Sequence, residues 1–256
     1  LKIASPVLPS NAVQGVKFDA GAFTAKLEAT GTDQDDEFIG GTLDNVFQGR
    51  SGTNTFTAGA GKNNFTGGKD KDTFIFAFAN FNTSATDIDK VDGGDGIDTL
   101  QFTDNVTVTT DDQAKIINDN AKLIEVLSLN SDKVDVAKIT AVKEYEIGGA
   151  NANVTVIGAT ESNKFTVLTN DSTLNLNGAG QKVDLTLKGA AVTDLTLLSR
   201  KGDADPLQTN TVTQLKADGN LTLTIITINS PTDTDRDLVL AAPTLTDGSV
   251  FTLEAS

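Results

Sequence analysis

Residues Gly31 to Ile75 read GTDQDDEFI, GGTLDNVFQ, GRSGTNTFT, AGAGKNNFT and GGKDKDTFI, five consecutive units of nine residues. The eighth position of each unit is phenylalanine, and these residues are Phe38, Phe47, Phe56, Phe65 and Phe74. A repeat of nine fits neither the helical period near 3.6 nor the strand period of 2. We therefore interpret each unit as half a coil of a β-solenoid, with glycines in the turns and phenylalanines stacked inside.

The sixth position of the repeat always carries a side-chain oxygen. It reads Asp36, Asn45, Asn54, Asn63 and Asp72, and a later copy, GGDGIDTLQ from Gly93 to Gln101, has Asp98 there. This frame resembles the RTX (repeats-in-toxin) nonapeptide, G-G-x-G-x-D-x-U-x, where U is a large apolar residue. The resemblance implies an all-β fold, a parallel β-roll or β-helix solenoid with calcium-binding turns.

Calcium takes about six to eight oxygen ligands, and a glycine-rich turn can direct backbone carbonyls toward one point while an aspartate adds charge. The resemblance implies that the position-six carboxylate and the turn carbonyls of successive coils share a site. The candidate ligands are Asp36, Asp72 and Asp98 at position six, with Asp33, Asp35, Asp70, Asp92 and Asp95 beside them.

The three middle units depart from the family pattern. Asn45, Asn54 and Asn63 keep an oxygen but lose the charge on which calcium affinity depends. These turns either bind calcium weakly or not at all, or their amides form a ladder of hydrogen bonds along the solenoid axis.

Composition limits the function. The chain of 256 residues carries 35 acidic and 20 basic residues, a formal charge of −15, which disfavours nucleic acid and anionic membranes as partners. The acidity fits a solvated surface and a need for divalent cations equally well. Cysteine, methionine, tryptophan and histidine are absent, which excludes disulfides, a Ser-His-Asp triad and the H-E-x-x-H zinc motif.

The location is expected to be extracellular or at the cell surface. No apolar run approaches the roughly 18 residues that span a membrane, and the first ten residues, LKIASPVLPS, do not resemble a signal peptide. The missing initiating methionine indicates a processed product or an excised segment. The family resemblance implies type I secretion, whose signal lies at the C-terminus of the full protein.

Three regions are expected. Residues 1–30 form a connector and capping strands around Val16, Phe18 and Phe23, or else the tail 1–8 adds as a strand to a neighbouring subunit. Residues 31–104 form the calcium-binding β-roll, in which Phe74, Phe76 and Phe78 are expected to alternate along one strand.

Residues 105–256 form the third region. One short helix is predicted near 111–121, capped by Asp111 or Asp112, and threonine- and asparagine-rich strands recur after it. Either a sandwich or a continuing solenoid fits, and the glycine-asparagine turns favour the solenoid. Residues 123–228 resemble the coils of RTX-type bacterial surface-layer (S-layer) proteins.

The first functional hypothesis is a structural, self-assembling extracellular protein that forms a calcium-stabilised surface layer, fibre or matrix. The alternative is a non-catalytic calcium-triggered folding or secretion module of a larger secreted enzyme, toxin or adhesin. The expected partners are further copies of the chain and cell-surface polysaccharide, without nucleic acid or membrane insertion. No carboxylate pair stands out as catalytic, so we do not expect an enzyme.

Overall fold

The computed structural model describes residues 1–3, 6, 15–81, 89–130, 132–148, 152–160, 162–169, 172–177, 181–188, 194–200, 210–228, 238–240, 242–245, 247 and 249–255. Two compact units are formed, the first by Leu1–Asp104 with Ala114–Leu127 and the second by Asn105–Gln113 with Ser128–Ser256. Parallel β-strands dominate both, which confirms the expected all-β solenoid class.

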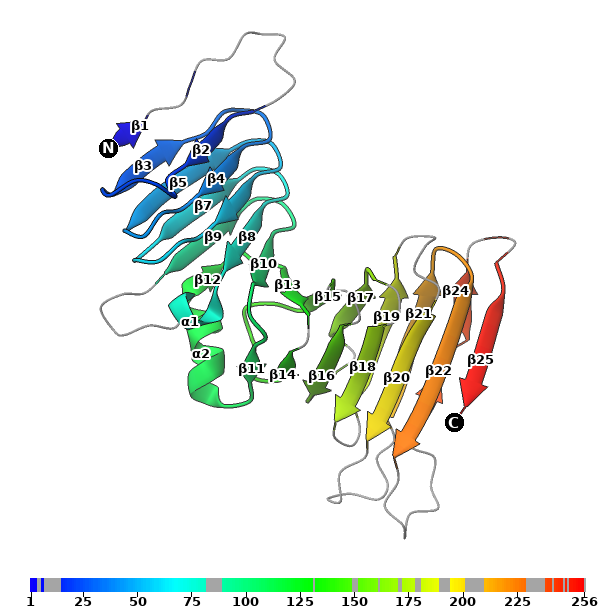
Figure 1. Ribbon diagram of the computed structural model, residues 1–256. Helices are drawn as coiled ribbons and strands as arrows, with labels where there is room; N and C mark the ends of the chain where they lie inside the picture. Colours follow the sequence, from blue (N-terminus) through cyan, green and yellow to red (C-terminus); the bar gives the residue numbers. More distant parts are fainter. Residues whose placement is uncertain are drawn as a thin grey trace. The chain divides into compact units, whose positions relative to one another are not determined.

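The first unit has two parallel sheets, and consecutive strands before the first helix alternate between them (Figure 1). One sheet has the order β1 (Lys2–Ile3), β3 (Leu27–Thr30), β5 (Asn45–Arg50), β7 (Asn64–Gly68), β9 (Lys90–Gly94) and β12 (Ala121–Lys122). The other contains β2 (Lys17–Asp19), β4 (Glu37–Ile39), β6 (Thr55–Thr57), β8 (Thr73–Phe76) and β10 (Thr99–Phe102).

The register confirms that each nonapeptide is half a coil. Phe38 pairs with Phe56 and Phe56 with Phe74 in one sheet, whereas Phe47 pairs with Phe65 in the other. These five side chains are fully buried, with ring centroids 4.7 Å apart for Phe38 and Phe56 and 4.8 Å apart for Phe56 and Phe74. Stacked aromatic pairs add about 0.5–1.5 kcal/mol each beyond their buried area, so the repeat builds its own core.

The N-terminal strands extend both sheets. Phe18 in β2 is buried and stacks on Phe38 with 5.0 Å between centroids, while Lys2 and Ile3 pair with Glu28 and Ala29. Phe23 does not lie in a capping strand, because the chain turns after Ala20, whose carbonyl accepts the Phe23 N–H. Its side chain is 41% exposed. Of the tail 1–8, residues 4, 5, 7 and 8 lie outside the described residues.

The regular coil ends after β8. The expectation that Phe78 continues this strand is wrong, because β8 stops at Phe76 and a short helix, α1 (Phe78–Phe81), begins. The Phe78 N–H donates to Asp104 Oδ1 at 2.6 Å, and the Phe78 ring packs edge-on against Phe102. The coil is 26 residues long here instead of 18, and a helical turn takes up part of the added length.

The predicted helix is α2 (Asp111–Asn120), where Ala114 and Ile117 are buried. Its expected cap was wrong. Thr110 is the N-cap residue, because the Gln113 N–H donates to Thr110 Oγ1 at 3.3 Å and the Thr110 N–H donates back to Gln113 Oε1 at 3.1 Å. This reciprocal pair is a capping box, which leaves Asp111 in the first turn.

The second unit is also built from parallel sheets, which confirms the solenoid and removes the sandwich alternative for its described strands. One sheet has the order β11 (Thr107–Val108), β14 (Lys133–Asp135), β16 (Asn153–Ile157), β18 (Ser172–Asn177), β20 (Asp194–Arg200), β22 (Leu221–Ile228) and β25 (Phe251–Ala255). The other contains β15 (Glu144–Ile147), β17 (Lys164–Val167), β19 (Lys182–Leu187) and β21 (Asn210–Ala217), and both β23 (Leu238–Leu240) and β24 (Pro243–Leu245) pair with β21.

Alternate side chains of the strands in the second unit are buried. Leu174 and Leu176 of β18 are fully buried, and Tyr145 lies in register with Phe165, its ring centroid 5.1 Å away. Strand β13 (Val126–Leu129) has residues in both units.

Candidate calcium-binding turns

Position six of the nonapeptide points into the first unit, at the edges where one sheet turns into the other. Its described side chains are almost completely buried, between 0% and 3% exposed: Asp36, Asn45, Asn54, Asn63, Asp72 and Asp98. Burying so many polar groups is unfavourable unless they find partners. Successive coils provide those partners along two separate columns, one at each edge.

The first column, defined by Asp36, Asn54, Asp72 and Asp98, links each turn to the next. The Asp36 N–H donates to Asn54 Oδ1 at 3.0 Å, and the Asn54 N–H donates to Asp72 Oδ1 at 2.8 Å. The Asp72 N–H then donates to Asp98 Oδ1 at 2.7 Å. One end of the column is closed by the Asp98 N–H, which donates to Glu125 Oε2 at 2.9 Å.

The second column, at the opposite edge, consists of Asn45, Asn63 and Asp89. Asn45 Nδ2 donates to Asn63 Oδ1 at 3.1 Å, and the Asn63 N–H donates to Asp89 Oδ1 at 2.6 Å. The first of these bonds is the amide ladder that the sequence offered as an alternative use of the asparagines. Because successive half-coils lie at opposite edges, Asn45 and Asn63 are in the second column and Asn54 is in the first.

Two carboxylate oxygens of the first column are buried without a hydrogen-bond partner, Asp72 Oδ2 and Asp98 Oδ2. Each faces the glycine that opens its own nonapeptide. A Cβ placed on Gly67 would lie 2.3 Å from both Asp72 Oδ2 and the Gly93 carbonyl oxygen. A Cβ placed on Gly93 would lie 2.4 Å from Asp98 Oδ2 and 2.0 Å from the Leu123 carbonyl oxygen.

These contacts bring a carboxylate oxygen and a carbonyl oxygen of the next coil together around the space that glycine leaves open. Two oxygen acceptors at such a place need a shared donor or a cation. Burial raises the pKa of Asp72 to about 6 and that of Asp98 to about 7, because the ionised carboxylates lose solvation.

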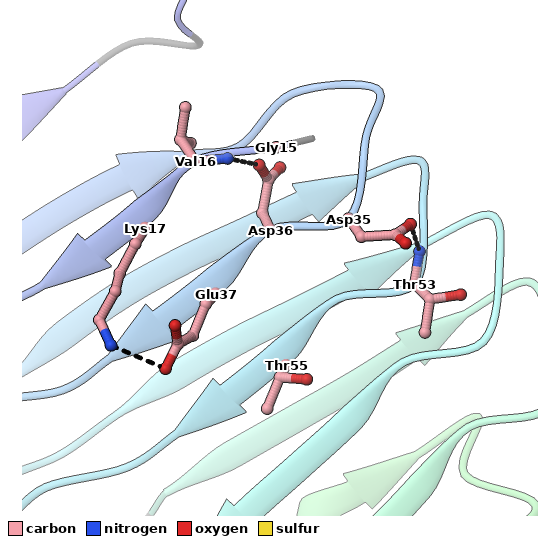
Figure 2. A pocket seen from close by; sticks show the side chains of 8 residues that line it. All are labelled: Gly15, Val16, Lys17, Asp35, Asp36, Glu37, Thr53 and Thr55. Carbon is pink, nitrogen blue, oxygen red and sulfur yellow. Dashed lines mark hydrogen bonds and ion pairs between the residues drawn. The ribbon is translucent and has the colours of Figure 1, made fainter. Parts of the chain in front are cut away.

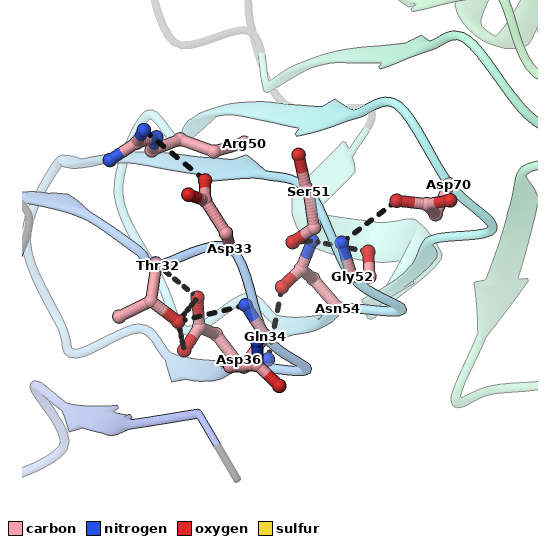
Figure 3. A network of polar contacts seen from close by, with 9 residues as sticks. All are labelled: Thr32, Asp33, Gln34, Asp36, Arg50, Ser51, Gly52, Asn54 and Asp70. Carbon is pink, nitrogen blue, oxygen red and sulfur yellow. Dashed lines mark hydrogen bonds and ion pairs between the residues drawn. The ribbon is translucent and has the colours of Figure 1, made fainter. Parts of the chain in front are cut away.

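Asp36 occupies the same position but is satisfied differently. Its Oδ2 accepts the Thr32 N–H at 2.5 Å, and Thr32 Oγ1 contacts both oxygens (Figure 3). Its Oδ1 also accepts the Val16 N–H at 2.7 Å. Threonine takes the place of the second glycine of the repeat in this first unit. Asp72 and Asp98 therefore offer better cation ligands than Asp36.

The other predicted ligands in the first turns lie on the surface and have partners within the protein. Asp33 forms an ion pair with Arg50 at 3.2 Å, and Asp70 Oδ2 accepts the Gly52 N–H at 2.9 Å (Figure 3). Asp35 Oδ1 accepts the Thr53 N–H at 2.8 Å. These three side chains brace neighbouring turns, and the charge of Asp70 also helps to raise the pKa of Asp72.

The two predicted ligands of the later copy lie on either side of Gly93 and Gly94. Asp92 is on β9, where Oδ2 pairs with Lys122 Nζ at 2.5 Å and Oδ1 is buried without a hydrogen-bond partner. Asp95 is exposed in the turn, and its N–H donates to the Gly68 carbonyl at 2.9 Å. The Asp92 charge helps to raise the pKa of Asp98.

Sequence reasoning did not place Asp89 and Glu125 in these columns. Asp89 could have been found by counting back from Gly93, because Asp89 and Val91 then fall at positions six and eight of a further frame. Glu125 follows a coil that does not keep the nonapeptide, so no comparable signal marks it. Asp87, two residues before Asp89, lies outside the described residues.

An open pocket lies beside the first coil, lined by Gly15, Val16, Lys17, Asp35, Asp36, Glu37, Thr53 and Thr55. Lys17 reaches across to Glu37 at 3.0 Å, and backbone N–H groups of Val16 and Thr53 bond to the two aspartates (Figure 2). Its charged groups are occupied in contacts between adjacent coils, which argues for a role in holding the first coil in register.

Within the described ranges, no group of three or more acidic side chains converges as a metal site. The oxygens that meet beside Gly67 and Gly93 are instead one carboxylate and one backbone carbonyl each. This donor set, all oxygen, suits a hard cation such as calcium better than zinc or copper. Asp72 and Asp98, with the carbonyls of Gly93 and Leu123, are the residues that would hold it.

The fold and the columns define a parallel β-solenoid with polar turns buried along its edges. Comparisons with protein-family models, with curated proteins and with solved structures give no match. Among the described helices, neither is long and apolar enough to cross a membrane.

Proposed function

We propose that this chain is a structural extracellular protein, a calcium-stabilised β-solenoid that self-assembles into a surface layer, fibre or matrix. The observation that carries the calcium part is the pair of buried oxygens, Asp72 Oδ2 and Asp98 Oδ2, each without a hydrogen-bond partner and each facing a carbonyl of the next coil. Bound calcium would supply positive charge between the turns of successive coils.

The rest of the architecture fits a scaffold role. Both units consist of parallel strands stacked in register, and such stacks extend along one direction. Cation binding only by the folded chain would add its binding free energy to stability by linkage. The sequence contains no histidine or cysteine, so an imidazole base and a thiolate nucleophile are both absent.

Electron microscopy and size-exclusion chromatography of the purified chain test the proposal, first with millimolar calcium and then with excess chelator. Ordered sheets or filaments that form with calcium and dissolve with chelator are the expected result. Assemblies that persist in chelator would contradict calcium control. A chain that stays monomeric in both conditions and folds only with calcium would instead identify a folding module of a larger secreted protein.

The double variant Asp72→Asn/Asp98→Asn is the matched control, since it keeps side-chain size and removes both buried charges. Its state of assembly should not respond to calcium or chelator. A calcium response as large as that of the wild type would place the controlling cation elsewhere in the chain.

A further inference from the structure

The carboxamide nitrogen of Asn54 sits in a shell of oxygen atoms. Nδ2 donates to the Gly52 carbonyl at 2.9 Å and to Asp72 Oδ1 at 2.8 Å, and the Ser51 carbonyl lies at 3.3 Å. Two of these oxygens belong to its own turn and one to the next coil. Figure 3 shows Asn54 close to Ser51 and Gly52 within this turn.

Asn63 repeats the arrangement at the opposite edge. Its Nδ2 lies 3.1 Å from the Gly61 carbonyl oxygen and 3.4 Å from those of Gly59 and Ala60. The neighbouring Asn45 Nδ2 contacts the Leu43 carbonyl at 2.5 Å and Asn63 Oδ1 at 3.1 Å. In each asparagine turn, therefore, one electropositive NH₂ group faces turn carbonyls and, for Asn45 and Asn54, an oxygen of the next coil.

The aspartate turns lack this group. Asp72 and Asp98 hold the same repeat position as Asn54, but an ionised carboxylate has no N–H to donate, and Oδ2 of each is left without a hydrogen-bond partner. The contrast is internal to one column, where residues 18 positions apart share a backbone environment. At position six one turn has an amide and the next a carboxylate, and the turn residues before them differ as well, with Gly52 in the place of Asp70.

We propose that the amide nitrogens of Asn45, Asn54 and Asn63 take the place of a cation, so that these turns are closed without metal and calcium is confined to the aspartate turns. This inference rests on the proposed function, because it concerns which turns of the solenoid take the metal. The asparagines are then specificity-determining residues that set the number of bound ions.

The charge argument supports the same division. An NH₂ group that already donates to the turn carbonyls occupies the ligands that a cation needs, and the neutral side chain offers no charge to attract it. The asparagine turns lie in the middle of the roll, between Thr32 with Asp36 and the later turns of Asp72 and Asp98. The middle coils would thus keep their turns in low calcium.

The test is Asn54→Asp, compared with Asn64→Asp as the matched control. Asn64 is exposed on β7 and sits ten positions further along the chain, so the control adds the same charge outside the column. Isothermal titration calorimetry and native mass spectrometry would count bound calcium, and thermal unfolding with calcium and with chelator would give stability. Asn54→Asp should bind at least one more calcium ion than wild type, and Asn64→Asp should bind the same number as wild type.

In chelator, Asn54→Asp should be less stable than Asn64→Asp, because the new carboxylate faces Asp72 and two carbonyls without a donor. Calcium should restore it. Equal calcium counts for wild type and Asn54→Asp, with equal stability in chelator, would overturn the inference while leaving the proposed function intact.

A wild type that binds no calcium would contradict the calcium part of the proposed function instead. The inference would still be decided by whether Asn54→Asp gains calcium-dependent stability. Asn63→Asp repeats the experiment on the opposite edge, and failure of both variants to fold at saturating calcium would overturn the inference.

Discussion

The backbone N–H of Asp72 donates to Asp98 Oδ1 at 2.7 Å, which places two buried carboxylates in adjacent coils of one column. This bond satisfies one oxygen of Asp98 and leaves its second oxygen, like that of Asp72, without a partner. The Asp72 charge also helps to raise the pKa of Asp98. The same pair therefore holds the turns together and accumulates negative charge inside them.

Replacing both carboxylates by amides tests whether the buried negative charge of Asp72 and Asp98 destabilises the metal-free protein. We expect Asp72→Asn/Asp98→Asn to be more stable than wild type in chelator, by roughly 1–3 kcal/mol, because it removes two poorly solvated charges and supplies NH₂ donors to the turn carbonyls. Urea unfolding in chelator measures the difference. Added calcium should stabilise wild type and leave the variant unchanged, and a variant that is less stable than wild type in chelator would contradict the account.

The raised pKa values predict how metal-free stability depends on pH. Burial raises the pKa of Asp72 to about 6 and of Asp98 to about 7, so the folded state binds protons more tightly than the unfolded state. Their contribution is fully present below the unfolded pKa near 3.8 and is lost as pH rises through about 6 and 7. In chelator, wild type should unfold at lower urea at pH 8 than at pH 5.

The control for this pH dependence is the double variant described above, which lacks both titrating groups. Its urea midpoint should change less between pH 5 and pH 8 than that of wild type. Parallel pH profiles for the two proteins would assign the effect to other groups.

Gly67 is expected to tolerate no side chain. A Cβ there would lie 2.3 Å from Asp72 Oδ2 and from the Gly93 carbonyl oxygen, far closer than van der Waals contact. We expect Gly67→Ala to abolish the calcium response of this turn and to destabilise the chain by about 1–3 kcal/mol through overpacking. Gly148→Ala is the matched control, because its nearest neighbour would lie 3.7 Å away. Equal calcium titrations for both variants would argue against a cation beside Gly67.

The phenylalanine columns carry the core of the first unit. Phe56 is fully buried between Phe38 and Phe74, whose centroids lie 4.7 and 4.8 Å away. Phe56→Ala should lower the free energy of unfolding by about 3–5 kcal/mol, with or without calcium, because it leaves a cavity in the stack. Phe23→Ala, at a side chain 41% exposed, should cost much less. Similar urea midpoints for the two variants would contradict the stack as the main source of stability.

Most of the fold of the first unit could be predicted, because its sequence repeats every nine residues. The nine-residue spacing of Phe38, Phe47 and Phe56 fixes both the half-coil and the side of the chain that is buried. Phe78 was misplaced because a strand pattern cannot show where a coil lengthens, and the bond from its N–H to Asp104 is formed 26 residues along the chain. The helix was predictable from its apolar spacing, but the cap depends on the local reciprocal bonds of Thr110 and Gln113.

The candidate site was predictable in composition and not in detail. Position six was recognised, but the sequence alone treats Asp36, Asp72 and Asp98 as equivalent. Each of the three carboxylates faces the glycine that opens its unit, but their hydrogen bonds differ. The Thr32 N–H and hydroxyl donate to Asp36, whereas Asp72 Oδ2 and Asp98 Oδ2 have no hydrogen-bond partner. Such differences depend on which atoms of neighbouring coils are in contact, and the nonapeptide pattern does not predict those contacts.

Among the described residues of the second unit, the one buried carboxylate is that of Asp132, and its two oxygens accept the N–H groups of Val106 and Asn130. Other buried turn side chains of this unit are amides. The Gln181 N–H donates to Asn210 Oδ1 at 2.9 Å, and Gln181 Oε1 accepts the Ala159 N–H at 3.1 Å. These neutral amides need no cation to balance charge. We therefore expect chelation to loosen the first unit around Asp72 and Asp98 and to leave the strands of the second unit protected.

Hydrogen exchange measured by mass spectrometry, with calcium and then with chelator, checks this difference. Amides of β8 and β10 should exchange at least tenfold faster in chelator, while those of β16 and β18 should keep their rates, because local opening depends on local stability. The double variant Asp72→Asn/Asp98→Asn should show no calcium effect in β8 and β10. Equally faster exchange in all four strands would mean that the two units unfold together. The stability of the second unit would then also depend on calcium, despite its amide turns.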